Sequence, residues 1–164
     1  MIIGTFGGDL KDKGVGVFGK KTKLFLFDSI SFNVFRGINP VGSGLSSDRL
    51  GSGGVQAGEV SLSRTSDASD ALILQAMCTA TKPIDKVTLS INNGDTNSTI
   101  EYVVLELSEV YISSYSSSSG GDKPGASISL SYTKFSFKTT STKSDNSSEG
   151  NNTFVWDVAK AAKG

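Results

Sequence analysis

Hydrophobic and polar residues alternate along most of this chain with the period of two that is typical of β-strands. Residues 22–35 (TKLFLFDSISFNVF) form the first long run of this kind. If they form one strand, one face carries Leu24, Leu26, Ile30, Phe32 and Val34, and the other carries Ser29, Ser31 and Asn33. Because Phe25, Phe27 and Phe35 add apolar surface to the second face, we expect both sides to be covered, at least in part. Shorter patterns predict strands at residues 1–6, 58–64, 86–92 and 154–158.

Two later runs change the phase of their alternation part-way along. In residues 99–115 the apolar positions pass from Ile100, Tyr102 and Val104 to Leu105 and Leu107, and then to Val110 and Ile112. In residues 126–139 they pass from Ile128, Leu130 and Tyr132 to Phe135 and Phe137. A phase change implies a β-bulge or a sharp bend, and long bent strands allow a sheet to curl. We therefore predict a mainly all-β fold: a β-barrel of two curled sheets with one short α-helix and a long extended loop, in a single domain over residues 1–164.

One segment has the signals of a helix. Ser69 is a natural N-cap residue, Asp70 suits the positive end of the helix dipole, and Pro83 lies just beyond the expected end. The body, residues 71–80 (ALILQAMCTA), is apolar almost all round, whereas a surface helix should show a polar face. We expect a neighbouring subunit to cover its second side, and the candidate interface residues are Leu72, Leu74 and Met77.

Residues 36–54 (RGINPVGSGLSSDRLGSGG) are expected to form a long loop, because their Gly and Ser content argues against a helix or a strand. Long loops inside a compact domain are uncommon and usually functional. This one carries apolar residues that favour covered positions, so we interpret it as an arm that orders against a partner. The candidate contact residues are Pro40, Leu45, Asp48, Arg49 and Leu50. A flexible excursion is the alternative.

Composition excludes several classes of function. Sixteen basic residues balance sixteen acidic residues, so no excess of positive charge favours nucleic acid; the local run of Lys20, Lys21 and Lys23 is more simply a solvated loop. The chain has no histidine and one cysteine, Cys78, which removes the commonest general base and any intrachain disulfide. We expect no cofactor and no metal. The first residues lack the pattern of a cleavable leader, and no apolar run is long enough to span a bilayer.

Two short motifs suggest chemistry that their surroundings do not support. Residues 14–19 (GVGVFG) match the glycine pattern of nucleotide-binding loops, but that motif needs a strand before it and a helix after it. Residues 131–134 (SYTK) match the Ser-x-x-Lys of some hydrolases. On a regular strand Ser131 and Lys134 point to opposite faces, so the lysine could not activate the serine. We therefore expect no catalytic residue and no enzymatic activity.

Several segments, taken in order, resemble the haemolysin-coregulated protein (Hcp) family, the tube subunit of the bacterial type VI secretion system. The similarity covers about residues 22–160 and rests on LFDSISFNVFRG (residues 26–37), on SLSRTSDASDALILQAMCTATKPIDKVTLSI (61–91), on IEYVVLELSEVYISSYSSSSGGDKPGASISLSYTKFSF (100–137) and on FVWDVAK (154–160). The first twenty residues depart from the family pattern. The third segment is the most specific, with its Glu-Tyr opening, its Ser/Gly/Asp loop and its Ser-Leu-x-Tyr return.

The resemblance implies a β-barrel subunit that assembles into homohexameric rings. The rings would stack into a hollow tube that carries effector proteins, is driven by a sheath and ends on a spike protein. It also implies a protein present in the bacterial cytoplasm and then exported by the type VI apparatus, with no membrane insertion.

Ser29, Ser31 and Asn33 are the candidate lumen-facing residues, because small polar groups suit a water-filled channel. An ordinary solvated strand face would look the same. The alternative function is a carbohydrate- or small-molecule-binding barrel, in which Tyr102, Tyr111, Tyr115 and Trp156 would supply an aromatic platform. A large apolar pocket within one subunit would favour that alternative.

Overall fold

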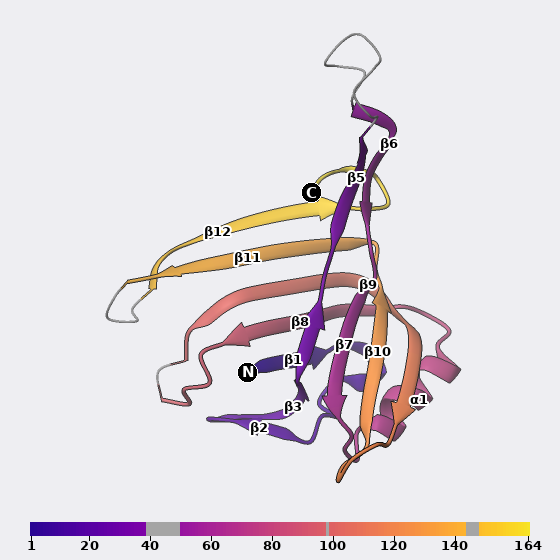
Figure 1. The fold of residues 1–164 in the computed structure, drawn as a ribbon, viewed down its shortest axis with the longest axis vertical. Coiled ribbons are helices and arrows are strands. Elements are labelled where there is room, and N and C mark those ends of the chain that lie inside the picture. The colour runs from indigo at the N-terminus through magenta and orange to yellow at the C-terminus, as the bar shows by residue number, and fades with distance from the viewer. Residues whose placement is uncertain (39–49, 98, 144–147) are drawn as a thin grey trace.

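The computed structural model describes residues 1–38, 50–97, 99–143 and 148–164 (Figure 1). Within these ranges the chain is mainly β, with a single α-helix, α1 (Asp70–Thr79), and a short 3-10 helix, η1 (Gly8–Leu10). The strands are β1 (Ile2–Phe6), β2 (Gly16–Phe18), β3 (Lys21–Phe27), β4 (Ser29–Ser31), β5 (Val34–Ile38), β6 (Leu50–Ala57), β7 (Val60–Thr65), β8 (Ile84–Asn92), β9 (Glu101–Ser118), β10 (Gly125–Ser131), β11 (Lys134–Thr142), β12 (Ser148–Asp157) and β13 (Ala162–Lys163).

Eleven of the described strands pair into one branched antiparallel sheet. One branch, here called the long sheet, has the order β13-β12-β11-β9-β8-β1-β3-β2. The second branch, here called the short sheet, has the order β9-β10-β7-β4. Figure 1 shows the two layers crossing, with β8, β9, β11 and β12 lying across the picture and β7 and β10 nearly upright. The predicted fold class, mainly β with one short helix, is confirmed.

Strand β9 belongs to both layers because it changes partners half-way. Its first half pairs with β8 and β11, and from Tyr111 onward it pairs with β10. Glu109 lies at the change, with a φ of +51° that few residues with side chains adopt. Its carboxylate accepts a hydrogen bond of 2.7 Å from the hydroxyl of Thr133. The bend predicted within residues 99–115 is therefore confirmed, whereas residues 126–139 form two strands, β10 and β11, rather than one bent strand.

The hydrophobic core fills the space between the two layers. It contains Phe6, Leu10, Phe25, Phe27, Val60, Leu62, Ile73, Val87, Leu89, Leu105, Leu107, Val110, Ile112, Ile128, Leu130, Tyr132 and Phe135. Helix α1 contributes Ile73, which is fully buried. A second, smaller cluster of Ile3, Phe18 and Leu24 lies apart from this core, with Leu26 packed against it.

The single long strand predicted for residues 22–35 is wrong. The chain forms β3, β4 and β5 in turn, and the alternation changes phase at the exposed Asp28, between β3 and β4. Leu24 and Leu26 belong to the small cluster, whereas Ile30 and Phe32 pack against the main core, so they do not share one face. The physical reason is that β3 belongs to the long sheet and β4 to the short sheet. The expectation that both sides are covered is confirmed for β3, where Phe25 and Phe27 join the main core.

The loop predicted for residues 36–54 is also partly wrong. Strands β5 and β6 pair as an antiparallel hairpin, with Val34 opposite Ala57 and Ile38 opposite Leu50. Figure 1 shows this hairpin rising well beyond the two sheets. The glycines within it did not prevent pairing, because backbone hydrogen bonds between the two strands do not require side chains. No helix in the described residues is long and apolar enough to cross a membrane.

Candidate functional site

The outward face of the short sheet is covered with serine side chains. Two rows of four lie directly opposite one another across the four strands: Ser29, Ser63, Ser127 and Ser116 in one row, and Ser31, Ser61, Ser129 and Ser114 in the other. We call these eight residues the serine face. Six are exposed and two are partly buried, so most of the hydroxyl groups face solvent.

The serine face arises from strict alternation on each strand. Ile30, Leu62, Ile128 and Tyr115 lie opposite one another on the other side of the same strands and pack in or against the core. The serines must therefore point outward. The hydroxyl groups of Ser29 and Ser63 lie 2.6 Å apart and share a hydrogen bond. No charged side chain occurs in either row, which makes the face polar but electrically neutral.

The short sheet is open at both sides. Within the described residues, β4 pairs only with β7, and residues 111–118 of β9 pair only with β10. An edge strand carries a row of unpaired backbone N–H and C=O groups that can bind another strand. One sheet therefore presents two different free edges, with the serine face between them.

Helix α1 packs against β9, with Leu72 and Met77 against the main core and Leu74 exposed on its outer side. Leu74 is 41% exposed, and Leu72 and Met77 are partly buried, while Ile73 points into the core. The exposed Tyr111 lies at the start of the open half of β9. The helix is thus covered on one side only, as its sequence suggested. Whether Leu72, Leu74 and Met77 form an interface stays a prediction.

A buried ionic cluster ties the start of α1 to the short sheet. Arg64 on β7 is only 2% exposed, and its guanidinium carbon lies 5.9 and 5.7 Å from the ring centres of Phe25 and Phe27. The guanidinium pairs with Asp67, and its Nε lies 3.3 Å from Oδ1 of Asp70. This second contact is electrostatic, since its geometry does not meet that of a hydrogen bond.

Asp67 also caps the helix entry. It accepts hydrogen bonds from the backbone N–H of Ser69 at 2.8 Å and from the Ser69 hydroxyl at 2.5 Å. Ser69 is the N-cap residue, as predicted, but its own hydroxyl makes no cap bond. Burial, together with the nearby Asp70 carboxylate, raises the pKa of Tyr115 above its usual value. Arg64 and Asp67 thus tie the start of helix α1 to the short sheet.

The hairpin of β5 and β6 also carries exposed apolar residues. Phe35 is 52% exposed, and Val34 beside it is exposed as well. Of the predicted contact residues, Pro40, Leu45, Asp48 and Arg49 lie outside the described residues. Leu50 opens β6 opposite Ile38. Because β5 follows β4 and β6 leads into β7, the hairpin continues the pair of β4 and β7 along its length, beyond the short sheet.

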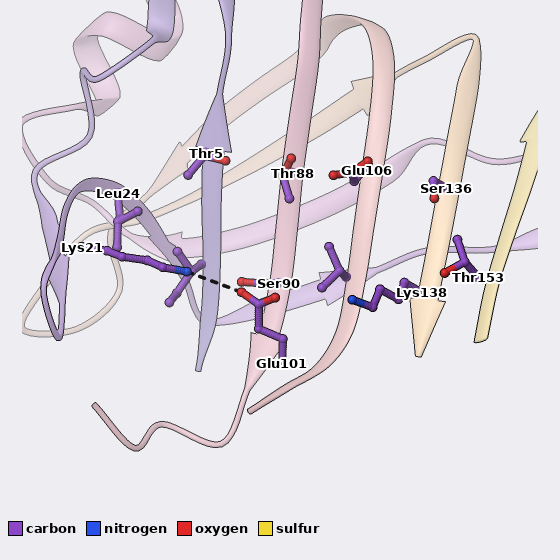
Figure 2. A pocket seen from close by; sticks show the side chains of 12 residues that line it. Thr5, Lys21, Leu24, Thr88, Ser90, Glu101, Glu106, Ser136, Lys138 and Thr153 are labelled. Carbon is purple, nitrogen blue, oxygen red and sulfur yellow. Dashed lines mark ion pairs between the residues drawn. The ribbon is translucent and has the colours of Figure 1, made fainter. Parts of the chain in front are cut away.

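The outer face of the long sheet differs in character from the serine face. A basin of about 380 Å³ lies there. Figure 2 shows its lining side chains, with Lys21, Glu101, Glu106 and Lys138 among hydroxyl-bearing residues. Lys21 pairs with Glu101 at 3.5 Å, as the dashed line in Figure 2 marks. Glu106 pairs with Lys86 at 2.8 Å. These solvated pairs of both signs give this face the mixed charge of an ordinary protein surface.

The two sequence motifs set aside above carry no chemistry in the structure. Residues 14–19 contain the edge strand β2 and the start of a turn, and strand β3 follows rather than a helix. Ser131 ends β10 on the exposed side and Lys134 begins β11, where it lies opposite Ser108 and Asp157. The proposed aromatic platform is divided, because Tyr115 and Trp156 pack against the core while Tyr102 and Tyr111 are exposed. The described residues contain no group of three or more potential metal ligands.

Comparison with known proteins decides the family. The model of the family described as "Type VI secretion system effector, Hcp" matches residues 13–139. The chain belongs to the Hcp family. It is accordingly a non-enzymatic tube protein of the type VI secretion system and is secreted by that system. No curated protein sequence matches the chain.

Solved structures agree with this assignment at the level of the fold. A type six secretion system protein superposes with a TM-score of 0.86 at 12% identity, covering 99% of this chain and 98% of that one. Hcp1 from Salmonella typhimurium gives a TM-score of 0.72 at 13% identity, with 99% and 97% covered. The secreted protein Hcp3 from Pseudomonas aeruginosa gives 0.60 at 12% identity, with 93% and 98% covered. At such low identity the whole Hcp fold is retained although few side chains are shared.

Proposed function

We propose that copies of this chain close into a ring by pairing the open β9 edge of one subunit with the β4 edge of the next. The observation that carries this proposal is the presence of two different free edges on one sheet. Two unlike edges make a heterologous, head-to-tail contact, which forms a closed ring when the rotation between subunits allows it. A hexamer is the ring size that the family resemblance implies.

The serine face then lines the central channel. It lies between the two edges that join neighbours, so closing the ring continues its rows from one subunit to the next. Neutral hydroxyl groups keep such a channel hydrated without attracting or repelling cargo by charge. Ser29 and Ser31 belong to these rows, and Asn33 follows them on the exposed side of the same segment. The long sheet, with its mixed charges, faces outward.

The apolar surfaces beside each edge support the same contact. Leu74 and Tyr111 lie next to the open half of β9, and Val34 and Phe35 follow directly after β4. Edge pairing would bring the apolar residues near β9 of one subunit towards those after β4 of the next, so that each set shields the other from solvent. We expect Pro40, Leu45, Asp48 and Arg49, together with Leu50 at the start of β6, to contact an adjacent subunit or the next ring. Stacked rings then form the tube that carries effectors and meets the sheath and the spike protein.

Cross-linking tests the proposed edge contact. In a Cys78→Ser background, Ser31→Cys and Ser114→Cys place one thiol near each edge. A short bis-maleimide should then join subunits into a ladder that ends at the closed ring. Ser127→Cys combined with Ser31→Cys is the matched control, because β10 lies inside the sheet between β7 and β9. Equal ladders from both pairs would reject the edge contact.

Sedimentation and electron microscopy test the ring itself. Negative-stain images should show rings, and a maleimide-gold label on Ser127→Cys should lie inside them. The same label on Thr153→Cys, an exposed position on the outer face of the long sheet, should lie outside. A species of subunit mass at about 10 μM would contradict intrinsic ring formation, because this concentration is well above the Kd expected for a stable assembly.

A further inference from the structure

Strand β2 is an edge whose exposed residues the fold itself does not explain. Within the described residues it pairs only with β3, at the end of the long sheet. Val15 and Val17 are 53% and 60% exposed. Edge strands that must stay unpaired usually carry charged residues or proline at such positions, so a pair of exposed valines on a free edge is unusual.

The side of residues 14–18 that faces β3 is closely packed. The exposed valines on the opposite side take no part in that packing. Gly14 and Gly16 are buried against β3. A Cβ at Gly14 would overlap the backbone carbonyl of Leu24, and one at Gly16 would lie 2.6 Å from Cγ of Leu26. Phe18 then anchors the strand in the small hydrophobic cluster. Since packing is complete on the inward side, the valines are free to serve an external contact.

The hairpin that presents this edge is held in one conformation. A two-residue turn joins Phe18 to Lys21, and Gly19 in that turn has a φ of +60°, which glycine adopts without strain. A Cβ at Gly19 would lie 3.1 Å from the carbonyl oxygen of Thr96. A preformed edge loses little conformational freedom when a partner strand is added.

Positive charge surrounds the edge. Five lysines (Lys11, Lys13, Lys20, Lys21 and Lys23) and two aspartates (Asp9 and Asp12) occur between residues 9 and 23, in a chain whose formal net charge is zero. All five lysines are exposed. Lys21 already pairs with Glu101; the other four lysines outnumber Asp9 and Asp12, so the segment keeps an excess of positive charge.

We propose that β2 is a strand-addition site for an extended acidic polypeptide segment with apolar residues at alternate positions. Its backbone would hydrogen-bond to the free edge, its apolar side chains would cover Val15 and Val17, and its carboxylates would meet the lysines. Recognition of this kind takes affinity from backbone bonds and specificity from alternate side chains. The site lies within one subunit and is independent of ring closure.

The charges favour a different protein over a second copy of this chain. The opposite end of the long sheet carries Lys160 and Lys163 around β13, and its acidic residue, Asp157, already pairs with Lys160. The open edges of the short sheet are uncharged, and the part of β12 beyond its pairing with β13 carries Glu149 as its one charged residue among those described. Asp28 before β4 and Glu109 before the open half of β9 are single acidic residues, so neither edge supplies the several carboxylates that the lysines of residues 11–23 would attract.

The test uses the full-length protein and the fluorescein-labelled peptide DEVTVTVED, with KKVTVTVKK as its charge-reversed control. Fluorescence anisotropy should show one acidic peptide bound per chain, with an affinity that falls at least about fivefold between 50 and 300 mM NaCl, because salt screens exposed charges. Lys20→Glu should weaken binding about tenfold and Val17→Thr several-fold. The matched control Lys82→Glu reverses an exposed lysine beyond helix α1 and should leave binding unchanged. Circular dichroism of each variant checks that it is folded.

Four results would overturn the proposal. The first is no binding at about 1 mM peptide, or equal binding of the two peptides. The second is undiminished binding of an acidic peptide that is N-methylated at its central valine and at the following threonine, since one of two successive N–H groups must face the edge and the change leaves the charge. The third is tighter binding of an oligo-thymidine strand, which would indicate a nucleic-acid site. The fourth is self-association that Val17→Thr abolishes, which would show that a second copy occupies the edge.

Discussion

Replacement of Arg64 by methionine should destabilise the protein and loosen the start of α1. Methionine keeps much of the side-chain volume between Phe25 and Phe27 but removes the positive charge. Asp70, whose side chain is 11% exposed, then becomes a buried carboxylate without a cation. Removing one partner of a buried ion pair costs about 3–5 kcal/mol. Because Asp67 is partly solvated, we expect a loss of about 3 kcal/mol for Arg64→Met, at the lower end of that range.

A double variant separates the charge effect from the packing effect. Arg64→Met combined with Asp70→Asn removes both charges, so it should recover about 1–2 kcal/mol relative to Arg64→Met alone. Asp85→Asn in the Arg64→Met background is the matched control, because Asp85 is exposed on β8 and should recover nothing.

Urea unfolding measures these differences. The single tryptophan, Trp156, packs against the core and reports unfolding by its fluorescence, and circular dichroism follows the strands. The m-value should stay constant, so that a shift in midpoint reports stability. The experiment is run at a dilution where sedimentation shows one species for every variant, because assembly would add to apparent stability. A loss below about 1 kcal/mol for Arg64→Met, or no recovery in the double variant, would refute the reasoning.

Two further predictions concern single positions. Burial raises the pKa of Tyr132 to about 12 in the folded protein. In an unfolded chain a tyrosine releases its proton near pH 10. The stability that Tyr132 contributes is therefore present below pH 10 and should be lost as the pH rises from about 10 towards 12. Tyr132→Phe should remove that dependence in urea titrations and cost about 1 kcal/mol at neutral pH, because the hydroxyl donates to the carbonyl oxygen of Gly58 at 2.8 Å; an unchanged alkaline slope in the variant would contradict the assignment. In thermal unfolding, Gly14→Ala should destabilise the protein by about 1–3 kcal/mol, because the added methyl group overlaps Leu24. Gly120→Ala, with open space around it, is the control and should have little effect. Equal effects of the two substitutions would show that β2 can shift to accommodate the methyl group.

Much of the fold could be predicted because it depends on local pattern. The helix was expected at residues 71–80 and spans Asp70–Thr79, and the phase change in residues 99–115 correctly indicated the bend near Glu109. The strand predicted over residues 22–35 failed at Asp28, where the chain passes from one sheet to the other. A change of sheet between two adjacent strands leaves no composition signal, since both sides of the break remain rich in β-formers.

The candidate surfaces, too, were predicted where they depend on local pattern and missed where they depend on strand pairing. Ser29, Ser31 and Asn33 were selected from one strand, but the serines of β7, β9 and β10 that complete the face were not. The Ser-rich runs were visible in the sequence; what was missing was the register that places them opposite one another. The hairpin of β5 and β6 was missed because its glycines suggest a loop when pairing is not known.

The sequence by itself determined which side of each strand is polar, where the helix lies and, through its order of segments, the Hcp family. These properties follow from residue type and from the spacing of apolar residues, which repeat every two positions in a strand and every 3.6 in a helix. Both can be read from residues that are close together in the chain. Only the tertiary structure decided that eight serines form two continuous rows, that β9 serves two sheets, and that β2, β4 and the end of β9 have no second partner strand among the described residues. Those features depend on pairing between residues far apart in the chain, and such pairing is set by how the whole core packs rather than by any local segment.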